Sequence, residues 1–278
     1  MRYTKMHGAG NSFLILECLR GEQKGEDLRD LALRLCSPHS GPGADGMIVI
    51  LPASEDADFA MLFYNSDGSV GEMCGNGARC VARYAVEHGL SPDPENIRFR
   101  ATAGMITARR IDRTRYEVRL PDPSVVDLLR STGEGFCSYV ELGDPGLPHA
   151  VVEVPSSAFE DLDALRRRGR ALRFNPVFPK GANVSFVCLT GEKSVRAVTF
   201  ERGVEDFTLA CGTGCGAIAA SLILRGRIPG DRAEIHMPGG VLSVRLTREG
   251  GSVRDLLLTG PTALVEEGEL PPPPALTA

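Results

Sequence analysis

The chain contains two nearly matching stretches, MCGNGARCVA at residues 73–82 and ACGTGCGAIA at residues 210–219. Each places a cysteine before Gly-x-Gly and then continues into an apolar, alanine-bearing run that predicts a helix. The two cysteines, Cys74 and Cys211, are 137 residues apart (211 − 74), close to half of the 278-residue chain. A thiol at the start of a helix most readily becomes a thiolate. Two such cysteines predict a pair of thiols that act on one substrate from opposite sides.

Other segments repeat at nearly the same spacing. GAGN at 8–11 precedes an apolar run, as GLPH does at 146–149, and GAD at 43–45 precedes another, as GAN does at 181–183. Asn65 and Arg202 each lie nine residues before a motif cysteine. We interpret the chain as a duplicated domain with halves 1–120 and 121–261. The boundary is expected at LPDP, residues 120–123, because two prolines cannot lie inside a paired strand.

Hydrophobic periodicity predicts the same order of elements in both halves. Helices are expected near 26–36, from Cys74 to about His88 with Gly89 ending the helix, and near 212–225. The Arg166–Arg168 run is expected on the exposed face of a helix, and the Pro271–Pro274 tail as a frayed terminus. Strands are expected near 12–18, 46–51, 58–64, 97–101, 105–109, 115–120, 149–154, 183–189, 195–201, 232–236, 241–247 and 252–258.

Composition narrows the class of protein. A hydrophobic content of 42% and a charged content of 24% are those of an ordinary soluble globular protein. The net charge of −5 gives no electrostatic reason to expect nucleic acid or an anionic membrane as a partner. No apolar run has the length of a signal peptide or a membrane span. We therefore expect a cytoplasmic protein that acts on a small molecule.

The cysteines and lysines narrow the chemistry further. Eight cysteines in a chain of this length do not indicate a disulfide framework. The spacings Cys74-x5-Cys80 and Cys211-x3-Cys215 lack a nearby histidine, so no metal site is expected. The four lysines lie outside the glycine motifs, which disfavours a pyridoxal Schiff base, and no cofactor is expected. They are Lys5, Lys24, Lys180 and Lys193.

A chemical hypothesis follows from the paired motifs. Unpaired amides at a helix N-terminus can hold a substrate carboxylate, and glycines allow its close approach. One thiolate would remove the α-proton while the opposite thiol delivers a proton to the other face, inverting the carbon. Amide hydrogen bonds that strengthen as charge builds on the carboxylate would lower the barrier. The plainer interpretation is that the glycines only relieve crowding where each helix begins.

The motifs of this chain resemble those of a known family, the diaminopimelate epimerases. The resemblance spans nearly the whole chain and is carried by MHGAGNSF (6–13), NSDGS (65–69), MCGNGARC (73–80), ERG (201–203) and ACGTG (210–214). It implies an isomerase that interconverts LL- and meso-2,6-diaminopimelate without pyridoxal, in lysine and peptidoglycan-precursor biosynthesis. It also implies a homodimer.

The implied fold is α/β (α+β), with two pseudo-symmetric halves. Each half would be a curved, mostly antiparallel sheet wrapped around a central helix, with the active site in the cleft between the halves. The last strand, within 262–278, would return to the first half.

The resemblance also implies residue roles. Cys74 and Cys211 would be the acid/base pair, and His149 and Glu201 would tune their pKa values. A second substrate carboxylate would need a forked cation such as Arg202. The implied substrate-binding set is Asn11, Asn65, Gly75, Asn76, Asn183, Glu201, Arg202, Gly212 and Thr213. Plainer interpretations are a strand-edge histidine capped by its neighbours for His149 and a surface ion pair for Glu201.

Some positions depart from the family pattern. Leu147 replaces an asparagine found in many members, Gly46 a glutamine, and Phe207 a polar residue. A tyrosine often found near the C-terminus for dimer contact has no match in LVEEG at 264–268. These departures concern substrate contacts and dimer geometry more than the reaction.

Two alternatives stay open. A related two-cysteine racemase could act on another amino acid such as histidine or proline, although a monocarboxylate would have no use for Arg202 and the asparagines. A redox-sensing, ligand-binding protein could instead close a reversible disulfide between the opposed thiols.

Overall fold

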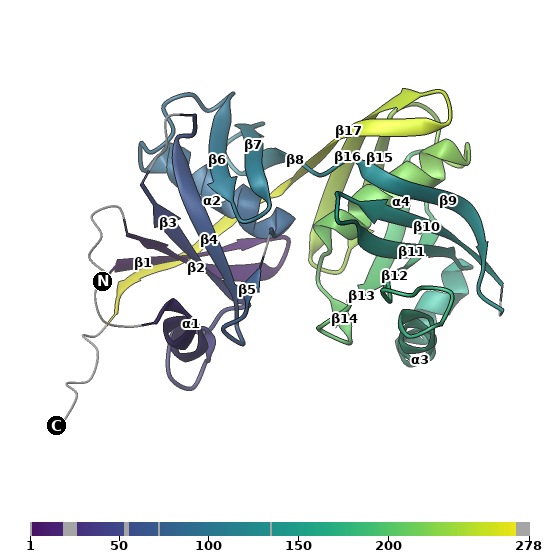
Figure 1. Ribbon diagram of the computed structural model, residues 1–278, viewed down its shortest axis with the longest axis horizontal. Coiled ribbons are helices and arrows are strands. Elements are labelled where there is room, and N and C mark those ends of the chain that lie inside the picture. The colour runs from purple at the N-terminus through teal and green to yellow at the C-terminus, as the bar shows by residue number, and fades with distance from the viewer. Residues whose placement is uncertain (1, 19–26, 53–55, 72, 134, 271–278) are drawn as a thin grey trace. The chain divides into compact units, whose positions relative to one another are not determined.

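The computed structural model describes residues 2–18, 27–52, 56–71, 73–133 and 135–270 (Figure 1). The chain divides into two compact units, unit 1 comprising Met1–Tyr116 with Thr262–Ala278 and unit 2 comprising Glu117–Pro261. The first segment of unit 1 thus ends within β8 (Arg115–Arg119) rather than at the proline segment. Pairing continues past this point, since the Leu120 amide donates to the Leu256 carbonyl. Pro123 is the first residue of β9 (Pro123–Ser131), where proline is tolerated.

Unit 1 is a mostly antiparallel sheet. Its strands pair in the order β18, β1, β2, β3, β4, β6, β7, with β5 also on β4 and only the β2–β3 and β4–β6 pairs parallel. Figure 1 shows the yellow β18 beside the purple β1. The bounds are β1 Arg2–Gly8, β2 Asn11–Glu17, α1 Leu28–Cys36, β3 Gly46–Leu51, β4 Phe59–Asn65, β5 Val70–Gly71, α2 Gly75–Glu87, β6 Ile97–Ala101, β7 Gly104–Arg110 and β18 Ala263–Glu269.

Unit 2 repeats this topology. Its strands pair in the order β9, β10, β11, β12, β13, β15, β16, with β14 also on β13 and only β11–β12 and β13–β15 parallel. β17 then pairs with β16. The bounds are β10 Phe136–Leu142, β11 Leu147–Glu153, η1 Ser156–Glu160, α3 Leu162–Arg173, β12 Asn183–Leu189, β13 Ser194–Phe200, β14 Phe207–Thr208, α4 Gly212–Leu224, β15 Arg232–Met237, β16 Gly240–Glu249 and β17 Ser252–Pro261. Two units with the same strand order and directions confirm the duplicated domain and the mixed α/β class.

Each unit is built around one buried helix. α4 has no charged residue and is buried except at Thr213 and Leu224, which are half-buried, as expected for a helix that is apolar all round. α2 carries two buried arginines whose guanidinium groups donate to acceptors in unit 1. The Arg79 guanidinium donates to the Gly75 carbonyl, and that of Arg83 donates to Glu87 and to the Thr262 carbonyl. Figure 1 shows each helix among the strands of its own unit, so the predicted central helices are confirmed.

Most predicted elements lie within a few residues of their expected bounds. α1 begins at Leu28, with the Asp27 side chain accepting from the Arg29 amide, and α2 ends before Gly89, whose φ is +71°. The arginine run lies on α3, and β18 returns to unit 1 as the resemblance implied. Residue 26, where a helix was expected to begin, and the Pro271–Pro274 tail lie outside the described residues.

Periodicity missed β1, β5, β9, β10, β14 and η1. The inward positions of β1 include Thr4 and Gly8 beside Met6, so the alternation of β1 has one large apolar residue to mark it. The outward side of β9 and β10 carries exposed Leu129 and Phe136, which obscures their alternation. None of the helices in the described ranges is long and apolar enough to cross a membrane.

We expect Leu222→Ala to lower the free energy of unfolding by about 2–5 kcal/mol, because it opens a cavity beside a fully buried α4 side chain. Urea unfolding followed by circular dichroism measures the change. Leu129→Ala is the matched control, since Leu129 is 66% exposed and its loss should cost less than about 0.5 kcal/mol. Equal effects of the two substitutions would contradict the central role of α4.

Candidate active site

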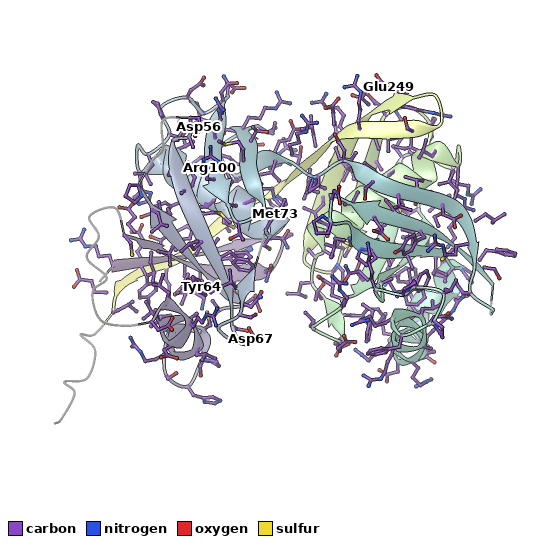
Figure 2. All side chains as sticks on the ribbon, viewed as in Figure 1. Asp56, Tyr64, Asp67, Met73, Arg100 and Glu249 are labelled. Atoms are coloured by element: carbon purple, nitrogen blue, oxygen red, sulfur yellow. The ribbon has the colours of Figure 1, made fainter. Side chains whose placement is uncertain are left out.

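The two motif cysteines are the N-cap residues of α2 and α4. Both have extended backbones, with φ and ψ of −128° and 116° at Cys74 and −111° and 108° at Cys211. Their carbonyls accept the first bonds of each helix, from the Ala78 amide at 2.7 Å and the Cys215 amide at 3.0 Å. Met73, labelled in Figure 2, marks the start of α2. The predicted placement of both thiols at helix N-termini is confirmed.

In unit 1 the Cys74 thiol lies near the side-chain amides of two asparagines. It donates to Asn11 Oδ1 at 3.7 Å, and Asn76 Nδ2 donates to the same oxygen at 3.4 Å. Asn76 Oδ1 in turn accepts from the buried guanidinium of Arg79 at 2.8 Å. Arg79 lies inside the first motif, but the spacing of the motif indicates no role for it. It orients Asn76, because a fixed cation beside Oδ1 leaves the amide nitrogen directed toward Asn11.

Asn65 is the last residue of β4, and its side chain bonds the turn that leads to β5. Its Nδ2 donates to Ser69 Oγ at 2.9 Å, and Asp67, labelled at this turn in Figure 2, accepts from the Ser69 amide. The structure thus joins Asn11, Cys74 and Asn76 in one bonded group, whereas Asn65 is tied to the neighbouring turn.

In unit 2 the thiol faces a carboxylate. The Glu201 carboxylate accepts from the hydroxyl of Thr208 and lies close enough to the Cys211 thiol for each group to affect the pKa of the other. Gly214 lies close to the Cys211 sulfur, and Thr213 Oγ1 lies 3.7 Å from that sulfur. Glu201 is therefore bonded to a hydroxyl and lies beside a buried thiol, and the surface ion pair considered for it is wrong.

Burial dominates the electrostatics of this thiol. It raises the pKa of Cys211 well above the ordinary value of 9.0, and the charge of Glu201 raises it further. The Gly214 amide and the Thr213 hydroxyl lower it. Burial likewise raises the pKa of Glu201, while its bonds from Thr208 and Cys211 lower it. The preference for thiolate expected from a helix N-terminus is thus overcome at Cys211 in this structure, and the protonated thiol is favoured.

His149 is an interior histidine. It is 0% exposed, lies on β11 opposite Asn183 of β12, and neither ring nitrogen has a hydrogen-bond partner among the described residues. Burial lowers its pKa from 6.5 to about 3, and the positive charge of Arg202 acts in the same direction. The interpretation as a strand-edge histidine capped by its neighbours is therefore wrong.

Asn183 and Arg202 lie next to this histidine. Asn183 Oδ1 accepts from the Arg202 amide at 2.7 Å, and the Arg202 guanidinium donates to the Lys180 carbonyl at 3.0 Å. Arg202 is exposed, so the rest of its donor fork can reach a ligand. Gly75 and Gly212 are the buried first residues of α2 and α4, where amides have no partner within the helix.

Strand register shows which residues of the two units correspond. Tyr64 pairs with Val70 as Phe200 pairs with Phe207, so the next residues, Asn65 and Glu201, occupy the same place. The sequence spacing matched Asn65 with Arg202 instead, because the loop before the second cysteine is one residue longer. Similarly, Phe13 pairs with Gly46 as His149 pairs with Asn183, so His149 corresponds to Phe13 rather than to Asn11.

Two of the departures have packing explanations. A side chain at Gly46 would place its Cβ 2.6 Å from the Phe63 ring and 2.8 Å from the Tyr64 carbonyl oxygen. Phe207 packs edge-on against Phe186 and Phe200, with ring centroids 6.4 Å and 6.1 Å away. No such reason is evident for Leu147. In the described ranges no group of three or more His, Cys, Asp or Glu side chains is arranged to hold a metal ion.

We expect the His149 ring to stay neutral between about pH 8 and about pH 5, because burial disfavours its charged form. Histidine ¹⁵N chemical shifts, assigned with His149→Phe, measure this. The unfolded chain takes up a proton near pH 6.5 and the folded chain near pH 3, so unit 2 should lose stability as the pH falls through this window. An imidazolium signal from His149 at pH 6 would contradict the structure.

Comparison with known proteins agrees with these features. The model of the diaminopimelate epimerase family matches residues 3–123 and 143–265. The diaminopimelate epimerase of Aquifex aeolicus is 36% identical over 282 residues, covering 97% of this chain and 98% of that protein. That of Hydrogenobaculum sp. is 37% identical over 279 residues, with the same coverage.

Solved structures share the fold. A phenazine biosynthesis protein of the PhzF family from Bacillus anthracis has a TM-score of 0.73 at 16% identity, covering 97% of this chain and 98% of that one. A probable proline racemase from Agrobacterium radiobacter has a TM-score of 0.71 at 19% identity, covering 99% and 94%. The family model and the relatives that match over almost their whole length show more than a shared fold. They show that this chain belongs to the diaminopimelate epimerase family.

Proposed function

We propose that this protein is a diaminopimelate epimerase, an isomerase that interconverts LL- and meso-2,6-diaminopimelate. The main structural support is that each unit places a cysteine at the N-cap of its buried central helix. The relatives that match almost the whole chain bear this activity in their names. Lysine and peptidoglycan-precursor biosynthesis is the corresponding setting.

In the proposed reaction, Cys74 and Cys211 act on one α-carbon from opposite faces. One sulfur takes the α-proton as a thiolate, and the other, as a thiol, gives a proton to the opposite face, so the carbon inverts and one proton is gained for each one lost. Amides at Gly75, Asn76 and Gly212 hold the α-carboxylate, and their bonds strengthen as negative charge builds on it. The raised pKa of Cys211 favours the protonated form that delivers a proton.

The distal end of the substrate is assigned to polar groups outside the helix N-termini. Asn11, Asn65 and Asn183 offer amides, and Arg202 offers an exposed guanidinium held by its backbone bond to Asn183. A planar guanidinium matches a second carboxylate with two parallel bonds. Diaminopimelate has such a group and proline lacks it, which favours the epimerase over the alternative racemase.

We also propose a cytoplasmic location and a homodimer. All eight cysteines are free, which suits a reducing compartment. The family resemblance is the support for the dimer, and light scattering of the purified protein tests it directly.

We expect the wild-type protein, without added pyridoxal, to exchange the α-proton of LL-diaminopimelate in deuterated water. Cys74→Ala and Cys211→Ser should each lower epimerisation at least about a hundredfold, because each removes one acid/base group. Mass spectrometry and ¹H NMR measure exchange and inversion. Cys188→Ser is the matched control, since its thiol bonds the Leu189 carbonyl, away from either N-cap. Full activity of Cys211→Ser would refute the two-thiol mechanism.

Binding of diaminopimelate without any exchange in the wild-type protein would instead favour the redox-sensing alternative. In that case oxidant and dithiothreitol should change ligand affinity rather than turnover.

We expect Arg202→Leu to raise KM for diaminopimelate by about 10- to 100-fold, because it removes charge-assisted bonds to one carboxylate. Steady-state kinetics on LL-diaminopimelate measure this. Arg167→Leu, on the exposed side of α3, is the control for loss of a surface cation. A wild-type preference for proline or histidine over diaminopimelate would overturn the substrate assignment.

A further inference from the structure

A row of three hydroxyl side chains crosses the sheet of unit 2 near Cys211. Ser185 on β12 pairs with Thr199 on β13, and Thr199 pairs with Thr208 on the short strand β14. Ser185 and Thr199 are fully buried, and their hydroxyl oxygens lie 2.9 Å apart. We call Ser185, Thr199 and Thr208 the hydroxyl row.

The hydroxyl row adjoins the start of α4. A Cβ at Gly214 would lie 3.2 Å from the Cys211 sulfur and 3.3 Å from Thr199 Oγ1, so sulfur and hydroxyl both approach this glycine closely. The last member, Thr208, lies three residues before Cys211 and donates its hydroxyl to Glu201 Oε1. The row therefore ends at the carboxylate that lies beside the Cys211 thiol.

Unit 1 has an apolar row at the same register. Ile48 pairs with Phe63, and Phe63 pairs with Gly71, which lies three residues before Cys74. A Cβ at Gly71 would come within 2.3 Å of the Phe63 ring, so the ring fills the space that a side chain would need. Asn65 stands where unit 2 has Glu201. Both members of the Thr208–Glu201 pair are thus replaced in unit 1, so the pair is not required by the shared fold.

We propose that Thr208 is a positioning residue, whose hydroxyl fixes the Glu201 carboxylate against the Cys211 thiol. This inference rests on the proposed function, in which Cys211 gives and takes a proton at the substrate. Thr208 acts through Glu201 and has no part in the proposed contacts with substrate.

The physical reason lies in the burial of Glu201. Burial favours the neutral carboxyl, whereas a hydroxyl that donates to Oε1 favours the ionised carboxylate. An ionised carboxylate can only accept hydrogen bonds, so the thiol must be the donor toward it. A neutral carboxyl can also donate, so it no longer requires the thiol to be the donor. Without the Thr208 hydroxyl, the carboxylate loses a charge-assisted bond and one constraint on its orientation.

Other charged groups near Glu201 are occupied elsewhere. His149 on β11 is held neutral by burial, and the Arg202 guanidinium bonds the Lys180 carbonyl. In the turn that follows Glu201, Glu205 pairs with Arg173 and Asp206 pairs with Arg166. Cys211, the N-cap residue of α4, is the titratable group beside the carboxylate. Thr208 and the Cys211 thiol are thus the neighbours that favour the ionised form of Glu201, in opposition to the effect of burial.

The test compares Thr208→Val, Thr208→Ser and Ser185→Ala in the full-length protein. Valine keeps the shape of threonine without the hydroxyl, and serine keeps the hydroxyl. Ser185→Ala removes a buried hydroxyl from the same row that bonds Thr199 rather than Glu201. Difference infrared spectroscopy follows protonation of the Glu201 carboxyl, with Glu201→Gln identifying its band. The pH dependence of kcat/KM on diaminopimelate gives the second measurement.

In Thr208→Val we expect Glu201 to protonate about one pH unit higher than in the wild type, because a bond that favours the ionised form is lost. The acidic limb of kcat/KM should move in the same direction. Thr208→Ser should restore both, and Ser185→Ala should change neither despite a lowered thermal midpoint.

A wild-type titration curve in Thr208→Val would overturn the inference, as would an equal shift in Ser185→Ala, which would assign the effect to packing of the row. The infrared titration needs no turnover. A wild-type protein that fails to epimerise diaminopimelate would therefore refute the proposed function separately, while the Thr208 contact is still tested.

Discussion

Burial of one helix inside each sheet is the constraint on which the rest of the structure depends. α4 has no charged residue between Gly212 and Leu224, so strands must cover it nearly all round. α2 meets the same requirement while carrying Arg79 and Arg83, whose terminal guanidinium nitrogens donate to groups of the same unit. Because each helix begins directly after a cysteine, covering the helix also fixes where the thiol lies and directs free amides toward it.

The two units use this shared scaffold for different chemistry. Near Cys74 the groups are neutral amides, with Asn11 accepting from the thiol and Asn76 donating to Asn11, whereas Cys211 lies beside the carboxylate of Glu201 in a more buried position. Burial and a neighbouring negative charge both hold a proton on sulfur, so the unit 2 thiol favours its protonated form. A duplicated fold can in this way place two cysteines in unlike surroundings, one near neutral amides and one beside a carboxylate.

Much of the fold could be read from periodicity and from the repeat, because helices and strands that bury one side carry a regular apolar pattern. The helices after Cys74 and Cys211 and the strand at 183–189 were predicted closely. β1 was missed because its buried positions include Thr4 and Gly8, and β9 was missed because its exposed positions include the apolar Leu129. The candidate site was found mainly from the motifs, but Arg79 and Thr208 were not, since their roles come from contacts with Asn76 and Glu201 that spacing does not reveal.

The sequence by itself determined the duplication, the two N-cap cysteines and the family, because these depend on residue order and local pattern. Only the tertiary structure decided which residues correspond across the repeat. Loops of unequal length shift the count, and strand register then aligns Glu201, not Arg202, with Asn65. It also decided that His149 is neutral and that Cys211 favours its proton, since burial and neighbouring charge arise only when distant strands and helices pack together.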